Sequence, residues 1–232
     1  MLVPAPPEQV VVVTAPAWDS QRATLRRYSW RDGQWLRAGR AVQAWVGVNG
    51  FAPWRTRLQN TGQTPAGTFG IPAAFGRGVG RGVALPYQQI TAATYWPYDP
   101  RDPRTYNVLQ TTRVPGARWR DDGQWSERLA EYGAAYRYAA VIGYNLPAST
   151  YAAANGERRT DEQADPSKGG GIFLHVSRNR PTAGCVAIPK KQMATTLRWL
   201  RPQAHPVIVM GPRMVTRGWR EATAAPGDTL SR

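Results

Sequence analysis

The stretch that decides the fold is Gly169-Gly-Gly-Ile-Phe-Leu-His-Val-Ser-Arg-Asn-Arg-Pro-Thr-Ala-Gly-Cys-Val-Ala-Ile188. It contains the only cysteine of the chain, Cys185, and one of its two histidines, His175. Residues 172–177 predict a strand approached by three glycines, and residues 178–181 predict a turn. The chain is therefore expected to reverse between imidazole and thiol, which brings the two side chains within hydrogen-bonding distance.

This pair suits nucleophilic catalysis. A cysteine attacks as its thiolate, and a free thiol is mostly protonated at neutral pH, so a base such as His175 is needed to activate Cys185. Gly184 permits a strained turn that exposes the thiol, and the backbone of Gly184 and Cys185 is the candidate oxyanion hole. The alternative is a small buried cysteine beside a core histidine with no catalytic role.

Acidic residues are absent from the sequence around the pair. Residues 33–98 contain no Asp or Glu but six Arg, and residues 166–220 contain none but ten Lys or Arg. No carboxylate close in the sequence can orient His175, so a backbone carbonyl is expected to hold its second ring nitrogen. The basic surroundings predict that Cys185 favours the thiolate.

Two motifs carry a family resemblance. His175 with Thr182-Ala-Gly-Cys185 resembles the His…Ser/Thr-x-Gly-Cys signature of YkuD-type L,D-transpeptidases. Upstream, Thr64-Pro-Ala-Gly-Thr-Phe69 resembles that family's Thr-Pro-x-Gly-x-Phe segment, in the same order along the chain. The resemblance extends over about residues 10–211 and implies a YkuD-like β-sandwich with one helix after the catalytic cysteine.

The chain departs from the family pattern in three ways. Many members have Arg where this chain has Ala187, and Gly where it has Val176. The interval between His175 and Cys185 is also shorter than in many members. These departures indicate a divergent branch of the family with a short active-site loop. They do not change the expected class of chemistry, but the identity of the substrate stays undetermined.

The resemblance implies cysteine acyl transfer onto peptidoglycan stem peptides. Cys185 would attack a stem tetrapeptide, D-alanine would leave, and an acceptor amine would complete a 3→3 cross-link. With water as acceptor the same site is an L,D-carboxypeptidase, and carbapenems are expected to acylate Cys185. The alternative from another class is a non-catalytic binding module for anionic cell-wall polymer.

Length and composition set the frame. A chain of 232 residues with 23 Gly and 20 Pro between short β-rich runs predicts a mostly β protein with a few short helices. We expect a single catalytic domain over residues 1–212, including an N-terminal β-meander, and a tail over residues 213–232. The meander is expected from strands at residues 9–15, 23–30, 34–36 and 41–48, with a hairpin turn at Asp32-Gly33.

The net charge of +15 suggests an anionic partner, either nucleic acid or the cell wall. The basic residues are scattered, and one Cys with two His cannot supply zinc-finger spacing, so neither nucleic acid nor a metal or cofactor is expected. No membrane-spanning stretch is found, and residues 1–8 lack the pattern of a signal peptide. The resemblance favours an extracytoplasmic, wall-bound or secreted monomer.

Other segments frame the predicted cleft. Residues 64–69 predict a stiffened loop forming one wall, and residues 126–136 predict a short helix capped by Ser126. Residues 137–145 predict a strand beside residues 172–177, which would place Tyr144 or Asn145 near the mouth of the site. Together with Thr182 and Arg178, these two are the predicted substrate-binding residues. Pro189 predicts the start of a helix whose apolar face includes Leu197.

Overall fold

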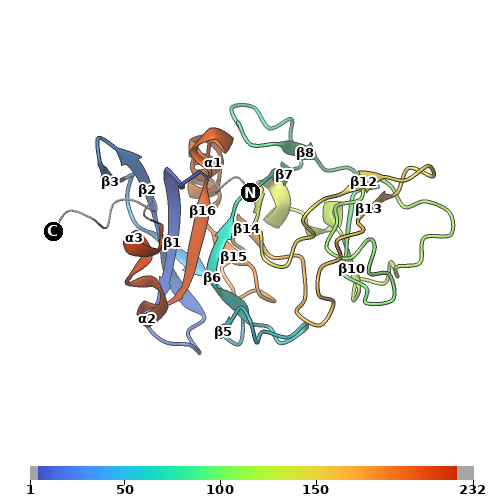
Figure 1. The fold of residues 1–232 in the computed structure, drawn as a ribbon, viewed down its shortest axis with the longest axis horizontal. Helices are drawn as coiled ribbons and strands as arrows, with labels where there is room; N and C mark the ends of the chain where they lie inside the picture. Colours follow the sequence, from blue (N-terminus) through green and yellow to red (C-terminus); the bar gives the residue numbers. More distant parts are fainter. Residues whose placement is uncertain (1–4, 224–232) are drawn as a thin grey trace.

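The structure is a computed structural model that describes residues 5–223. It is mostly β, with few and short helices, as the sequence predicts, and this is consistent with the sandwich that the resemblance implies. A 12-stranded sheet runs in the order β5-β6-β16-β1-β2-β4-β15-β14-β11-β7-β8, with β3 added beside β2 (Figure 1). Among residues 5–223, no helix has the length and apolar character needed to cross a membrane.

The N-terminal meander is built around the valine-rich strand β1 (Gln9–Ala15), which is buried on both faces as predicted. It pairs antiparallel with β2 (Arg22–Arg31) and parallel with β16 (Val207–Pro212). The predicted hairpin is confirmed, since β2 turns directly into β3 (Gln34–Arg37). Strand β4 (Val42–Trp45) then returns along the other edge of β2.

Strand β14 (Phe173–Val176) contains His175, and strand β15 (Val186–Ile188) begins directly after Cys185. The two strands are parallel neighbours in the sheet. The predicted reversal is therefore not a hairpin, because residues 177–185 carry the chain back before β15 begins. Such a connection is usually much longer, and here the strands are short enough for it to close. Thr182 anchors the connection to the end of β4: its N–H donates to Val46 O at 2.9 Å, and Val48 N–H donates to Thr182 O at 2.8 Å.

The helix that follows Cys185 is confirmed as α1 (Lys190–Trp199), preceded by Pro189. Met193 and Leu197 are fully buried in the core that the sheet encloses, together with Leu174 of β14 and Ile188 of β15. Packing of this apolar helix face against β14 and β15 stabilises the parallel pair, because burying each such side chain contributes about 1.5–3 kcal/mol to the stability of the fold.

Two predicted elements are wrong. Residues 64–69 are not a loop but strand β6 (Thr64–Gly70), between β5 (Phe51–Pro53) and β16. Pro65 is tolerated because the ladder with β16 begins only at Gly67, so no donor is missing there. The strand also borders neither of the cavities at the candidate site.

The second error is the helix expected at residues 126–136. Ser126 caps no helix: β10 (Ser126–Arg128) pairs with the aromatic strand β9 (Tyr95–Pro97). Two short 3-10 helices follow, Leu129–Tyr132 and Ala135–Arg137, and Gly133 between them has a positive φ of 56°. Tertiary pairing with β9 thus overrides the local helical pattern.

The predicted pairing beside the histidine is confirmed, although the strand is shorter than the predicted residues 137–145. Strand β11 (Ala139–Val141) lies antiparallel to β14, with Ala139 opposite His175. The outer edge continues through β7 (Ala74–Gly76) and β8 (Tyr87–Gln89), and a small separate hairpin is formed by β12 (Tyr151–Ala152) and β13 (Arg158–Arg159).

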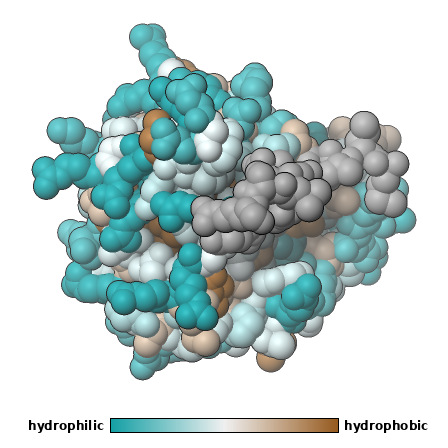
Figure 2. All heavy atoms as spheres, turned by 60° about the vertical axis from the view of Figure 1, so that its left-hand side comes forward, coloured by the Kyte–Doolittle hydropathy of each residue, from teal (hydrophilic) through white to brown (hydrophobic). Residues whose placement is uncertain are grey.

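The first part of the predicted tail is folded. Helices α2 (Arg213–Thr216) and α3 (Trp219–Ala222) follow β16, and the Trp219 ring packs 4.6 Å from Tyr28 and 5.2 Å from Trp35. The visible surface at this end is mostly hydrophilic, with apolar side chains scattered singly (Figure 2). Residues 224–232 of the predicted tail lie outside the described residues.

Candidate active site

The ladder between β14 and β15 sets the geometry of the site. Leu174 is opposite Val186 and His175 is opposite Ala187. Because side chains alternate between the faces of a strand, His175 lies on the same face as Ala187 and as the residue two positions before it, Cys185. The short Ala187 side chain therefore lies beside the imidazole.

The thiol of Cys185 is nearly buried, with 8 % of the residue exposed. Phe173 N–H donates to Sγ at 3.3 Å, and Sγ–H donates to Gly171 O at 3.4 Å. In the part of the chain that is described, no hydrogen bond joins Sγ to His175, which corrects the expected direct contact. Catalytic hydrogen bonds are often long before substrate binds, and a turn about the Cα–Cβ bond redirects the thiol.

His175 is oriented by the backbone, as predicted. Its Nδ1 lies 2.9 Å from Val176 O, so Nδ1 carries the proton and donates to that carbonyl. Nε2 remains as the acceptor nitrogen. The Tyr136 ring meets the imidazole edge to face, with ring centroids 5.5 Å apart, and fixes its plane.

Burial shifts both pKa values toward the neutral forms. It raises the pKa of Cys185 to about 12, and the charge of Glu127 acts in the same direction. It lowers the pKa of His175 to about 4, with a smaller contribution of the same sign from Arg178. The resting pair is therefore thiol and imidazole, and the expectation that basic surroundings favour the thiolate is wrong, because desolvation outweighs the charge of Arg57.

Gly184 shapes the turn that precedes Cys185. Its φ of 145° is a conformation that other residues rarely adopt. A Cβ at this position would lie 3.0 Å from Gln63 O and 3.1 Å from Arg57 Nη2. Thr182 closes the turn: Oγ1 accepts from Gly184 N–H at 3.1 Å and donates to Cys185 O at 2.6 Å.

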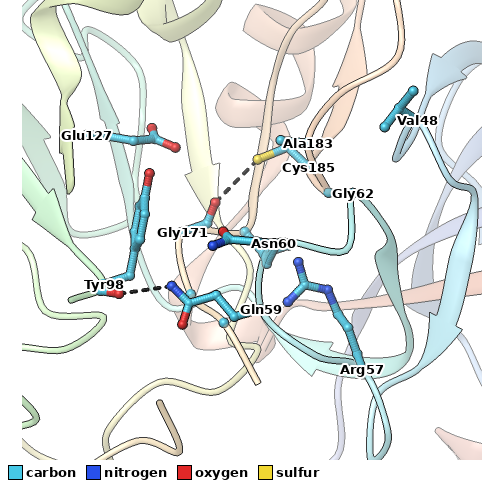
Figure 3. Close-up of a pocket in the computed structure, with 14 residues that line it drawn as sticks. Val48, Arg57, Gln59, Asn60, Gly62, Tyr98, Glu127, Gly171, Ala183 and Cys185 are labelled. Carbon is cyan, nitrogen blue, oxygen red and sulfur yellow. Dashed lines mark hydrogen bonds between the residues drawn. The ribbon is translucent and has the colours of Figure 1, made fainter. Parts of the chain in front are cut away.

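Two cavities meet at Cys185. The first, which we call the glycine-lined cavity, has a volume of 270 Å³ and is bordered by Gly169–Gly171, Gly184 and four residues ahead of β6, namely Arg57, Gln59, Asn60 and Gly62 (Figure 3). The second, the histidine-lined cavity, has a volume of 170 Å³ and is bordered by His175, Ala187, Tyr132, Arg178 and residues 180–183. Cys185, Ala183 and Glu127 border both cavities.

Glu127 is a site residue that sequence reasoning missed. It comes from β10, and its carboxylate accepts a hydrogen bond from Tyr136 Oη. Figure 3 shows the carboxylate and the hydroxyl end of Tyr98 side by side, both on the side of the cavity that faces Cys185. Burial raises the pKa of Glu127 to about 7, although the Tyr136 hydrogen bond opposes that shift. The sequence analysis missed Glu127 because it placed residues 126–136 in a helix and gave them no role in the site.

The predicted substrate-binding residues divide into two groups. Thr182 and Arg178 border the histidine-lined cavity. Tyr144 and Asn145 border neither cavity: Tyr144 Oη donates to Lys168 O at 2.9 Å, and Asn145 Nδ2 donates to Gly169 O at 2.8 Å. The two side chains thus hold the backbone at the start of the glycine triplet, outside both cavities. Their direct contact with substrate stays a prediction.

Further residues that the sequence analysis did not assign to the site border the glycine-lined cavity, namely Arg57, Gln59, Asn60 and Tyr98. The sequence gives only a weak signal for these residues, because none of them belongs to a recognisable motif. Within residues 5–223, no group of acidic, His or Cys side chains is arranged to hold a metal ion.

Comparison with protein families adds the decisive observation. The family model of the YkuD L,D-transpeptidase catalytic domain matches residues 18–209, which is most of the chain. The protein belongs to the YkuD family. Searches of curated proteins and of solved structures found no match. Membership in the YkuD family implies cysteine-dependent transpeptidase chemistry, a peptidoglycan substrate and a place of action outside the cytoplasm.

Proposed function

We propose that this YkuD protein is a peptidoglycan L,D-transpeptidase that forms 3→3 cross-links. Cys185 takes the acyl group of a stem tetrapeptide with release of D-alanine, and a side-chain amine of a second stem then receives it. One observation carries the proposal: Cys185 borders both cavities, whereas His175 borders only one. A nucleophile between two cavities, with its proton-transfer group on one side, suits a reaction with an acyl donor and an amine acceptor.

In the first step, Cys185 Sγ bonds to the carbonyl carbon of the third stem residue while its proton passes to His175 Nε2. The thiol pKa lies far above that of the imidazole, so the proton moves as the bond forms and not before. The negative oxygen is held by the Cys185 N–H; the Gly184 N–H is already engaged by Thr182 Oγ1. Collapse expels the amine of D-alanine, which takes the proton from His175 and leaves a thioester.

In the second step, an acceptor amine attacks the thioester carbon and gives a proton to His175. The sulfur leaves and recovers that proton, so the enzyme returns to its neutral pair and the new amide is the cross-link. If water attacks in place of the amine, the product is a tripeptide acid and the activity is that of an L,D-carboxypeptidase. We propose that the enzyme works outside the cytoplasm as a monomer, with residues 1–212 as its catalytic domain.

The test of the nucleophile is intact-mass spectrometry after incubation with meropenem. We expect the wild type to gain the mass of one meropenem, and Cys185→Ser to gain nothing. Circular dichroism of both proteins checks that the variant is folded. An unmodified wild type would contradict the acyl-enzyme and favour a binding module for wall polymer.

The test of the acceptor uses purified disaccharide tetrapeptides and chromatography of the products. Cross-linked dimers with free D-alanine are the expected result. Monomeric tripeptides alone would show that water is the acceptor and that the enzyme is a carboxypeptidase.

A further inference from the structure

Arg57 is an unusual feature of the glycine-lined cavity, because it is a buried cation. The residue is only 3 % exposed. Its Nε donates to Gln63 O at 2.7 Å and its Nη1 donates to Lys168 O at 2.6 Å. Two of the three nitrogens are therefore held by backbone carbonyls from two segments distant in the sequence, which fixes the plane of the guanidinium.

No carboxylate among the described residues forms an ion pair with Arg57. Burying a charge without a counter-ion costs several kcal/mol. The third nitrogen, Nη2, lies against Gly184, 3.1 Å from where a Cβ would be, directly before the nucleophile. Figure 3 shows the guanidinium pointing into the space that Asn60 and Gly62 border. The guanidinium also lies over the Tyr144 ring, with Cζ 5.4 Å from the ring centroid, but this contact leaves it without a counter-ion. A fixed guanidinium that has no carboxylate partner on a cavity wall is a site for an anion, and a carboxylate matches its planar fork.

The position of His175 decides which part of the substrate enters this cavity. His175 must give a proton to the leaving amine and take one from the acceptor amine, so both amines occupy the histidine-lined cavity. The acyl part of the donor then lies on the other side of Cys185, in the glycine-lined cavity.

We infer that Arg57 binds a carboxylate on the acyl side of the donor peptide and thereby selects donors; this rests on the proposed function. Two carboxylates of a stem peptide qualify: the α-carboxylate of the γ-linked glutamate, and the side-chain carboxylate of a diaminodicarboxylic acid as third residue. Both present the same chemistry to Arg57, and Asn60 adds a polar side chain at the same wall.

The experiment compares three synthetic tetrapeptide donors with the wild-type enzyme. One donor carries both carboxylates, one has the glutamate α-carboxylate amidated, and one has the third-residue carboxylate amidated. The rate of D-alanine release gives kcat/KM. We expect amidation of the carboxylate that Arg57 binds to lower kcat/KM by about 10- to 100-fold, the range for a lost hydrogen bond between charged groups. The amidated donor that shows the lower kcat/KM identifies which of the two carboxylates Arg57 binds.

The variants Arg57→Lys and Arg57→Gln test whether this arginine makes the distinction. Arg57→Gln should process the free-acid and amide donors at equal rates, and Arg57→Lys should keep part of the preference. The matched control is Arg55→Gln, since Arg55 is exposed, lies over the Trp54 ring at 4.6 Å and borders neither cavity. It should retain the full preference.

The outcomes are separable. A wild type that accepts meropenem but uses all three donors equally overturns the inference and leaves the proposed function standing; this comparison holds even if Arg57 variants fail to fold. Folded Arg57 variants that keep the preference also overturn it. A wild type that reacts with neither meropenem nor any peptide overturns the proposed function, and the inference with it.

Discussion

The two cavities that meet at Cys185 are built differently. The glycine-lined cavity has a rigid wall: Asn107 Oδ1 accepts from Gly171 N–H at 2.9 Å, and Arg57 is fixed by two backbone carbonyls. The histidine-lined cavity has exposed arginines at its rim, Arg178 and Arg180, in the connection between β14 and β15. The contrast indicates that the glycine-lined cavity is pre-organised and that the histidine-lined cavity is more adaptable. Under the proposed function, these are the sides of the acyl donor and of the amine.

The largest expected effect is on the proton-transfer group. Because the Cys185 thiol is neutral with a pKa of about 12, His175→Gln should slow acylation by meropenem by roughly 10²–10⁴-fold, measured by time-resolved mass spectrometry. His205→Gln is the matched control, since His205 is exposed and borders neither cavity. Equal rates in all three proteins would mean that the two cavities do not differ in proton transfer.

The next prediction concerns the wall that the cavities share. Gly184→Ala forces a Cβ to 3.0 Å from Gln63 O at a φ of 145°, so it should cost about 1–3 kcal/mol of stability. Chemical denaturation measures this loss, and acylation should slow as well because the turn shifts Cys185. Gly78→Ala is the control, with open space around it and no positive φ. A Gly184→Ala protein as stable as the control would show that the wall is not rigid.

Glu127 borders both cavities, and its titration gives a pH-dependent prediction. Its folded pKa of about 7 lies above the ordinary value of 4.5, so the folded state holds the proton more tightly. The resulting stability is fully present below pH 4.5 and is lost as pH rises through 7, by roughly 3 kcal/mol. Glu127→Gln should remove this loss in denaturation measured from pH 4 to 8.

The same substitution should also affect the thiol. The Glu127 carboxylate raises the pKa of Cys185 when it is charged, which is above pH 7. Iodoacetamide should therefore alkylate Glu127→Gln a few times faster than wild type at pH 8, with a smaller difference at pH 6. A difference that is independent of pH would show that Glu127 acts on Cys185 by packing and not by charge.

The smallest effect is expected at the adaptable rim. Arg178 is exposed, and its guanidinium donates to Tyr132 O. Because exposed charges contribute about 1 kcal/mol or less, Arg178→Gln should raise the KM for the acceptor only about two- to fivefold, and added salt should reduce the difference. If Arg178→Gln changes the acceptor KM by a larger factor than Arg57→Gln changes the donor preference, the proposed contrast between the cavities is reversed.

How far the sequence predicts the molecule differs along the chain. The valines of β1, the Asp32-Gly33 turn and Pro189 before α1 each act locally, and the elements they predict are confirmed. Residues 126–136 fail because pairing of β10 with β9 decides their structure, and no local pattern shows that partner.

The candidate site divides in the same way. His175, Cys185 and the carbonyl at Nδ1 follow from one continuous stretch, and the carbonyl is confirmed. The thiol pKa could not be predicted from net charge, because it depends on desolvation by aromatic neighbours that are distant in sequence, such as Trp96 and Tyr136. Arg57 and Glu127 reach the site through the sheet topology, which spacing alone does not reveal.

The anchoring of Thr182 to the end of β4 has a consequence for how the enzyme can diversify. The anchor separates residues 177–181, which carry the exposed arginines, from the turn that holds the nucleophile. Insertions or replacements ahead of Thr182 can therefore change the preferred amine without moving Cys185. This short segment is the natural place to graft loops when engineering new acceptors, while the donor side is kept unchanged.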